Sequence, residues 1–256
     1  IMLPINTIDP FLSFFKSGYH HIAYDYSTRV TLKHNEYPLL RTPLPTGIVN
    51  QSLRPHIFLV IMESVNHSAL EKKGETGKSI LPTMSKLRER SVYIPRFYGN
   101  SVQTAKGHFA SLFSLIPSIS GKAFTKYPKL HTPSIASILS KYGYTSHYFA
   151  AHNSREFDNT HPFLKEHGFK HLNVVADFLT EKDKQERMTW GVDDSTFYKR
   201  FFNFFDSHTK KDTSPQLFVI TTIANHFPFN STPEEKRAMF KYPDGFKENY
   251  ANSVHL

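Results

Sequence analysis

Three apolar runs of strand length, separated by helical patterns, constrain the fold of this chain more than any other feature of its sequence. Residues 56–62, 145–150 and 216–222 are rich in aliphatic, aromatic and β-branched side chains. A short run of this kind is typical of a strand in a parallel sheet, where both faces are covered. Because helical patterns separate the runs, the sequence predicts an α/β fold with a mostly parallel central sheet and helices on both faces.

The signals that start and stop helices support this alternation. Residues 132–143 open with Thr-Pro, carry an apolar face at helical spacing and close at Gly143. Asp193 and Asp194 precede phenylalanines at helical spacing, and a last helix is expected over residues 246–256. Proline near the start and glycine just past the end are the usual boundaries of a helix.

The first 54 residues differ in composition from the rest of the chain. They hold several prolines and a short aromatic patch, without sustained apolar periodicity. We expect residues 1–54 to form an extended connector that follows a membrane anchor in the full-length protein. Residues 55–256 are expected to form the folded domain. Because the chain starts at Ile1 and stops within the predicted last helix, we expect a fragment whose domain is incomplete at its C-terminal end.

Composition narrows the classes of partner. The net charge of +9 favours anionic partners such as phosphate esters, acidic glycans or lipid headgroups. Basic residues are scattered and aromatic residues lie inside the apolar runs, so the pattern does not predict binding to nucleic acid. No apolar run is long enough to cross a bilayer, so membrane contact would need a segment outside this chain. The absence of Cys excludes thiolate metal sites and Cys nucleophiles, and the oligomeric state is left open.

Polar side chains follow each predicted strand. Glu63 comes after the first strand, His152 after the second, and Asn225 with His226 after the third. Because the carboxyl ends of parallel strands meet at one edge of a sheet, we expect these side chains to gather there. Each of them also has an ordinary explanation, since loops are commonly polar. A carboxylate directly after a buried strand needs a partner, and a divalent cation, an arginine or a helix N-terminus would each supply one for Glu63.

Thr104 stands where a helix over the following apolar residues would begin. Its position alone favours a helix N-cap, which is a common use of threonine. The alternative is a nucleophile, because a hydroxyl at a helix N-terminus lies in a positive field and a bound metal would lower its pKa further. His226 opens a His-Phe-Pro-Phe sequence. Its imidazole could protonate a leaving group or hold an anion, and packing alone would explain the two phenylalanines.

Short motifs between residue 55 and the C-terminus, taken with the residues above, point to a family. They are Val60-Ile61-Met62-Glu63-Ser64, Leu81-Pro82-Thr83-Met84, Gln103-Thr104-Ala105-Lys106-Gly107, Glu156-Phe157-Asp158-Asn159 with Gly168-Phe169, Trp190-Gly191-Val192-Asp193 and Asn225-His226-Phe227-Pro228-Phe229. In their order and spacing the chain resembles the sulfatase and alkaline phosphatase superfamily. Within it, the chain is most similar to the lipoteichoic-acid-synthase type of phosphoglycerol transferase.

The resemblance implies a site and a reaction. Glu63 and Thr104 would bind one divalent metal, Mn²⁺ or Zn²⁺, with Mg²⁺ also possible. Thr104 would attack a phosphodiester, and the phospho-threonine intermediate would then pass its phosphoryl group to an acceptor hydroxyl. The substrate-binding residues implied by the same match are His226, His152, Asn225, Asp158 and Asn159.

The implied protein is an extracytoplasmic enzyme at the cell membrane, on its outer or periplasmic face. It would transfer a phosphoglycerol or phosphoethanolamine group from a lipid donor to an envelope glycan or lipid, so an anionic lipid or glycan is its expected partner. The family completes its metal site with an Asp-His pair, and no Asp-His dipeptide occurs in this sequence. The fragment alone is therefore expected to be inactive.

Other functions stay open at this stage. A phosphodiesterase would use water in place of the acceptor, and a degenerate, non-catalytic member would bind an anionic glycan. A sulfatase of the usual type needs Cys or Ser where this chain has Thr104, which argues against that activity. The Trp and Arg with which lipoteichoic-acid synthases hold glycerol phosphate are not evident near residues 157–160. The identity of the transferred headgroup is therefore open.

Overall fold

The computed structural model describes residues 53–74, 77–185, 190–229 and 245–255. The chain divides into two compact units, residues 1–49 with 127–131 and residues 50–126 with 132–256. Every strand and helix named here belongs to the second unit. The connector expected over residues 1–54 lies, apart from its last two residues, outside the described part of the chain. No helix among the described residues is long and apolar enough to span a membrane.

A four-stranded parallel sheet forms the centre of the second unit. Its strands are β1 (Ile57–Ile61), β2 (Thr145–Ala150), β3 (His171–Val174) and β4 (Gln216–Thr221). They lie in the order β1-β4-β2-β3, and all three pairings are parallel. The α/β fold with a mostly parallel sheet is thus confirmed, and the three apolar runs became β1, β2 and β4.

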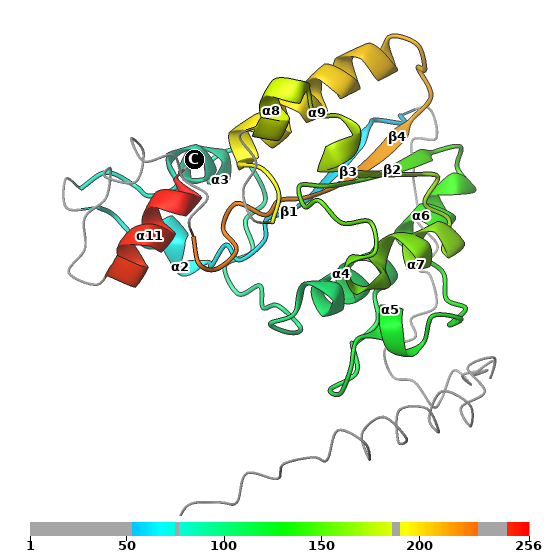
Figure 1. The fold of residues 1–256 in the computed structure, drawn as a ribbon, viewed down its shortest axis with the longest axis horizontal. Coiled ribbons are helices and arrows are strands. Elements are labelled where there is room, and N and C mark those ends of the chain that lie inside the picture. Colours follow the sequence, from blue (N-terminus) through cyan, green and yellow to red (C-terminus); the bar gives the residue numbers. More distant parts are fainter. Residues whose placement is uncertain (1–52, 75–76, 186–189, 230–244, 256) are drawn as a thin grey trace, which may run out of the picture. The chain divides into compact units, whose positions relative to one another are not determined.

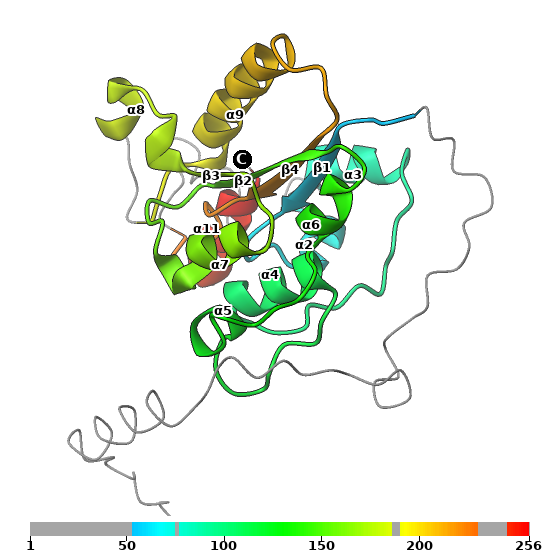
Figure 2. The same cartoon turned by 90° about the vertical axis from the view of Figure 1, so that its right-hand side faces the viewer.

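Helices cover both faces of the sheet (Figures 1 and 2). α8 and α9 lie over one face, and α4, α6 and α7 lie over the other. The helices are α2 (Ser68–Glu71), α3 (Pro82–Arg88), α4 (Thr104–Phe113), α5 (Ala123–Lys126), α6 (Ile135–Ser140), α7 (Thr160–Glu166), α8 (Glu181–Gln185), α9 (Asp194–Thr209) and α11 (Gly245–Val254), with the short 3₁₀ turns η1 (Phe157–Asn159) and η2 (Val175–Asp177).

Local side-chain bonds explain where two predicted helices begin. α6 starts at Ile135, two residues after the expected Pro133, because Ser134 is its N-cap and forms a capping box with Ser137. The chain then turns at Gly143, whose φ of +82° favours glycine. α9 starts as predicted, with the Asp193 carboxylate accepting a 3.0 Å hydrogen bond from the backbone N–H of Thr196.

Aromatic side chains fill the core between the sheet and α9. Phe149 of β2 and Phe218 of β4 pack against Phe197 and Phe201 of α9, and all four are fully buried. Burying each such side chain contributes about 2 kcal/mol. Side chains alternate along a strand, so Tyr148 points to the opposite face, toward α4 and α7. This two-sided burial fixes the register of β2 and with it the position of the loop that follows.

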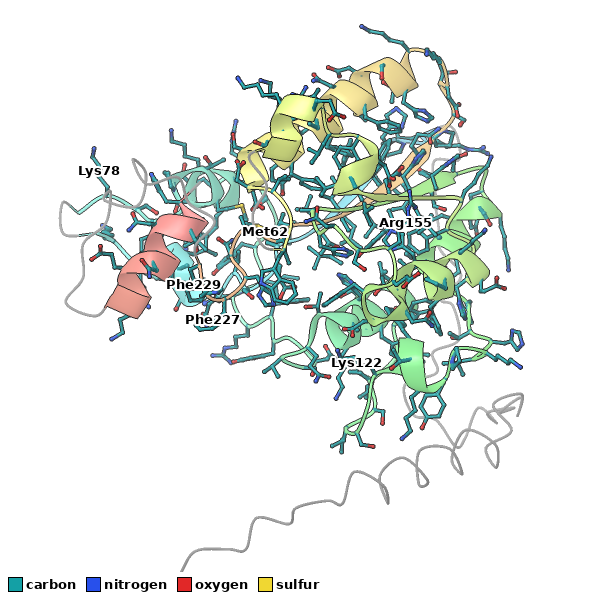
Figure 3. All side chains as sticks on the ribbon, viewed as in Figure 1. Met62, Lys78, Lys122, Arg155, Phe227 and Phe229 are labelled. Atoms are coloured by element: carbon teal, nitrogen blue, oxygen red, sulfur yellow. The ribbon has the colours of Figure 1, made fainter. Side chains whose placement is uncertain are left out.

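The strand order decides which loops meet. β4 lies between β1 and β2, so the segments that follow these three strands are neighbours at the carboxyl edge of the sheet. Beyond the end of β1, α2, α3 and α11 enclose a smaller core that includes Ala69, Ile80 and Val254. Phe229 packs against Tyr250 of α11 with ring centroids 5.4 Å apart, which ties the loop after β4 to this smaller core (Figure 3).

Candidate active site

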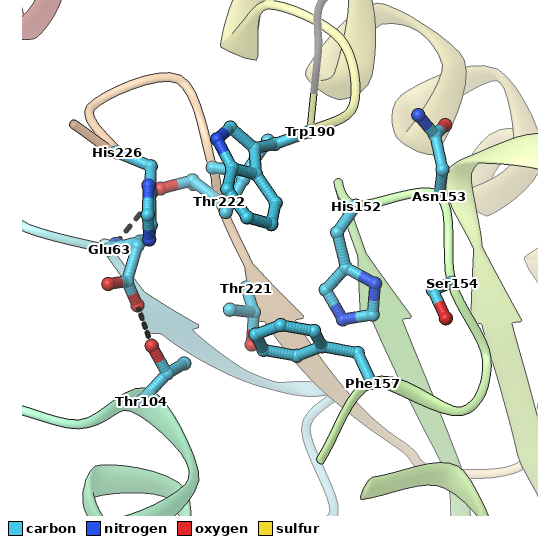
Figure 4. Close-up of a pocket in the computed structure, with 11 residues that line it drawn as sticks. Glu63, Thr104, His152, Asn153, Ser154, Phe157, Trp190, Thr221, Thr222 and His226 are labelled. Carbon is cyan, nitrogen blue, oxygen red and sulfur yellow. Dashed lines mark hydrogen bonds between the residues drawn. The ribbon is translucent and has the colours of Figure 1, made fainter. Parts of the chain in front are cut away.

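A pocket of about 140 Å³ opens at the carboxyl edge of the sheet (Figure 4). Its lining comes from the end of β4, from the segments after β1, β2 and β4, from the start of α4 and from the segment before α9. The residues that line it are Glu63, Thr104, His152, Asn153, Ser154, Phe157, Trp190, Thr221, Thr222, Ile223 and His226. The structure therefore brings together Glu63, Thr104, His152 and His226, four residues singled out from the sequence.

Glu63 and Thr104 are in direct contact. The Thr104 hydroxyl donates a 3.0 Å hydrogen bond to Oε2 of Glu63, and the Ser64 hydroxyl donates to Oε1 at 3.2 Å. The backbone N–H of Glu63 donates to the Thr222 hydroxyl at 3.1 Å, which ties the end of β1 to the end of β4. Hydrogen bonds therefore hold Glu63 at both carboxylate oxygens and at its backbone N–H.

The N-cap interpretation of Thr104 is wrong. Thr104 is the first residue of α4, and its N-cap is Gln103, which makes no side-chain capping bond. The threonine hydroxyl thus does not serve the helix backbone and points instead at Glu63 across the pocket (Figure 4). The N-terminus of this ten-residue helix carries a partial positive charge that favours an anion beside Thr104.

His226 and Trp190 line the pocket in contact with each other (Figure 4). Their ring centroids are 5.0 Å apart. Nδ1 of His226 lies 2.8 Å from the Phe227 carbonyl oxygen. A carbonyl oxygen only accepts, so Nδ1 carries the proton and Nε2 is left for another partner. Trp190, the single Trp of the chain, belongs to one of the motifs but was not predicted as a site residue.

Histidines also lie at the floor of the pocket and behind it. His152 lines the pocket beside Phe157, with ring centroids 5.4 Å apart. Behind it, Nε2 of the buried His108 lies 3.2 Å from the Thr221 hydroxyl, and His161 packs against Tyr148. Burial lowers the pKa of His108, His152 and His161 to about 4, so these three rings are neutral at neutral pH.

The other predicted substrate residues do not line the pocket. Asn225 is buried, at 2% exposure. Asp158 accepts hydrogen bonds of 2.6 and 2.7 Å from Lys122, and the Asn159 amide donates to the Phe124 carbonyl at 2.6 Å. The last two side chains thus connect η1 to the segment around α5, and the substrate roles of all three residues stay predictions.

The residues present fit one side of a divalent metal site. Glu63 and Thr104 offer a carboxylate and a hydroxyl, which are ligands that Mg²⁺ and Mn²⁺ accept. Among the described pocket residues there is no Lys or Arg, so the Glu63 carboxylate has no cationic side chain beside it there. Within the described part of the chain, no group of three or more His, Cys, Asp or Glu could hold a metal. Further ligands would have to come from elsewhere.

The structure is an α/β domain with a pocket at the carboxyl edge of its parallel sheet, and comparison with known proteins identifies its family. The sulfatase family model matches residues 55–256. The chain belongs to the sulfatase family, as its motifs indicated.

Two lipoteichoic acid synthases are among its relatives. Lipoteichoic acid synthase 2 of Bacillus subtilis is 25% identical over 209 residues, which are 78% of this chain and 30% of the relative. The structure of the lipoteichoic acid synthase LtaP from Listeria monocytogenes superposes with a TM-score of 0.70 and 22% identity, covering 78% of this chain and 48% of LtaP. The chain thus spans about a third of the curated relative and about half of the solved one.

A phosphoethanolamine transferase shares the fold. The soluble domain of lipooligosaccharide phosphoethanolamine transferase A from Neisseria meningitidis superposes with a TM-score of 0.58 and 14% identity, covering 79% of this chain and 58% of that domain. At this identity the likeness concerns the fold alone.

Proposed function

We propose that this chain is part of an extracytoplasmic, metal-dependent transferase that moves a phosphoglycerol or phosphoethanolamine group from a lipid donor to an envelope glycan or lipid. The observation that carries the proposal is the Thr104 hydroxyl, bonded to Glu63 at the carboxyl edge of the sheet instead of capping its own helix. Similarity to lipoteichoic acid synthases supports the class of reaction. Attachment to the membrane would be through a segment outside this chain.

In the first half of the proposed reaction, the Thr104 hydroxyl gives up its proton to solvent, and Oγ1 of the resulting alkoxide attacks the phosphorus of a lipid phosphodiester. The Oγ1–P bond forms, the bond from phosphorus to the diacylglycerol oxygen breaks, and that oxygen takes a proton from a protonated His226. Because Nδ1 of His226 is bonded to the Phe227 carbonyl, Nε2 is the atom that would give this proton. A Mn²⁺, Zn²⁺ or Mg²⁺ ion held by Glu63 and Thr104 would lower the pKa of the hydroxyl.

In the second half, a hydroxyl of the acceptor attacks the phospho-threonine. The new O–P bond forms, the Oγ1–P bond breaks to restore the Thr104 alkoxide, and His226 takes up the proton of the acceptor hydroxyl. The pocket has room for a phosphoryl group and a few further atoms. The lipid tails and the acceptor chain would therefore lie outside it.

Substitution of Thr104 by alanine tests the nucleophile. We expect the full-length Thr104→Ala protein to form no covalent phosphoryl adduct when mixed with vesicles of phosphatidylglycerol or phosphatidylethanolamine, because the attacking oxygen is gone. Intact-protein mass spectrometry measures the adduct. Thr125→Ala, which changes an exposed threonine of α5, is the matched control and should keep it. An adduct that persists in Thr104→Ala would exclude Thr104 as the nucleophile.

Substitution of Glu63 by glutamine tests the metal ligand. Loss of a direct carboxylate ligand should weaken Mn²⁺ binding by about 100-fold or more. Titration calorimetry of the full-length protein with Mn²⁺ alone measures this affinity without any substrate. Glu156→Gln removes an exposed carboxylate outside the pocket and should leave the affinity unchanged. Equal Mn²⁺ affinity in Glu63→Gln and the unmodified protein would remove Glu63 from the metal site.

A further inference from the structure

The segment Trp190–Asp194, which the proposed reaction leaves without a role, contacts both loops that carry the pocket histidines. At one end, Gly191 pairs with His152 in an antiparallel bridge, and the Trp190 carbonyl accepts a 3.1 Å hydrogen bond from the Asn153 backbone. These contacts attach the segment to the loop after β2.

At its other end, the segment contacts the loop after β4. Oδ1 of Asp194 accepts a 3.2 Å hydrogen bond from the backbone N–H of Ala224, and the N–H of Ile223 also bonds this carboxyl group. The Ile223 carbonyl in turn accepts a 2.9 Å hydrogen bond from the backbone N–H of His226. Asp194 is thus one hydrogen-bonded turn away from His226.

The two adjacent aspartates at the start of α9 have different hydrogen-bond partners. Asp193 caps the helix through Thr196, whereas Asp194 reaches out of the helix to the loop after β4. A helix cap does not need this second carboxylate. Burial raises the pKa of Asp194 to about 6, so this group is held in its place at a cost in solvation. Trp190, at the far end of the same segment, lies against the ring of His226.

We propose that Asp194 is a positioning residue: it fixes the turn 223–226 so that His226 lies against Trp190 in the lining of the pocket. The role in catalysis rests on the proposed function, but the positioning itself does not. A misplacement of about 1 Å in a reacting group can lower a rate by about 100-fold. Loss of this anchor should therefore displace His226 and lower the rate, although Asp194 itself does not contact the substrate.

The first test is optical and needs no turnover. Acrylamide quenching of Trp190 fluorescence is measured in the full-length protein, with Trp190→Phe subtracted to isolate this one residue. Asp194→Ala should raise the quenching constant, because the released turn exposes more of a Trp190 residue that is 44% exposed in the folded protein. Asp194→Asn keeps an oxygen acceptor for the Ala224 N–H and should restore the unmodified value. Asp193→Ala is the matched control, since it removes the α9 cap and leaves the bonds to residues 223 and 224 intact.

The second test is kinetic, on full-length protein with phosphatidylglycerol or phosphatidylethanolamine vesicles. Asp194→Ala should lower kcat by about 10- to 100-fold with a smaller change in KM, and Asp193→Ala should stay close to the unmodified enzyme. If the unmodified protein shows no turnover, the proposed function fails while the quenching result still decides the positioning role. Unchanged quenching in Asp194→Ala, or an equal rise in Asp193→Ala, would overturn the proposal.

Discussion

Replacement of Gly191 by alanine should destabilise the protein by about 3 kcal/mol or more. A Cβ atom at this position would lie 1.9 Å from the carbonyl oxygen of Ala151, 2.9 Å from its carbonyl carbon and 3.0 Å from Cγ2 of Ile223. Ala151 is fully buried directly after β2, and its N–H bonds the Thr221 carbonyl of β4. The Ala151 backbone cannot move aside without breaking its hydrogen bond to β4. Glycine is therefore required here by the close approach of the Ala151 backbone. Its φ does not require glycine, since it lies outside the left-handed region.

Urea unfolding of Gly191→Ala against the unmodified protein measures this effect. Gly107→Ala is the control, because a Cβ at Gly107 of α4 meets nothing within 4 Å. That change should leave stability unchanged or raise it by about 0.5–1 kcal/mol, as expected for glycine to alanine inside a helix. Equal free energies of unfolding for Gly191→Ala and Gly107→Ala would show that the segment at Gly191 can shift to make room for the added Cβ. Gly191→Ala should also separate Trp190 from His226, because Trp190 lies on the segment of Gly191 and His226 lies on the loop that this segment contacts.

The protein should lose stability steeply as the pH falls from about 6.5 to about 4. Burial lowers the pKa of His108, His147, His152 and His161 to about 4, against an ordinary value of 6.5. Between these two values the unfolded chain binds protons that the folded chain does not, so the free energy of unfolding falls with the pH. Each such proton contributes about 1 kcal/mol per pH unit, and below about pH 4 the slope ends because the folded state takes up protons too.

One carboxyl group opposes this trend. Burial raises the pKa of Asp194 to about 6, so the folded state binds a proton there that the unfolded chain does not, from pH 6 down to its ordinary 3.8. Asp194 alone would therefore stabilise the protein as the pH falls through this window. Four histidines outweigh one carboxyl group, so net loss of stability is expected.

Urea unfolding near neutral pH and at about pH 5 checks the prediction. His161→Asn should flatten the pH dependence by about one proton, because it removes one of the buried titrating rings. The same substitution at exposed His131 is the control and should leave the slope as it is. Equal free energies of unfolding at the two pH values would contradict the assignment of these rings as neutral in the folded protein.

Much of the fold follows from local sequence. The runs that became β1, β2 and β4 were located to within one residue at each end, because strand length, apolar content and the flanking turn residues are all local properties. β3 was not predicted. Its four residues, His171–Val174, alternate polar with apolar over too short a stretch to be told from a loop, and only pairing with β2 makes them a strand.

The site was predictable only in part. Glu63, His152 and His226 converge as expected, since parallel strands carry their C-terminal residues to one edge and the sequence alone marks where each strand ends. Asp158 and Asn159 matched a family motif, but their side chains are bonded to Lys122 and to the Phe124 carbonyl. No sequence pattern shows which of two polar partners a side chain will meet.

The sequence by itself determined the alternation of strands and helices and the edge at which the polar residues gather. Tertiary structure alone decided that the Thr104 hydroxyl turns toward Glu63, that Asp194 reaches the loop after β4, and that Trp190 lies against His226. Apolar periodicity is a property of neighbouring residues. These contacts join residues far apart in the chain, and their partners are fixed only when the sheet closes with β4 between β1 and β2.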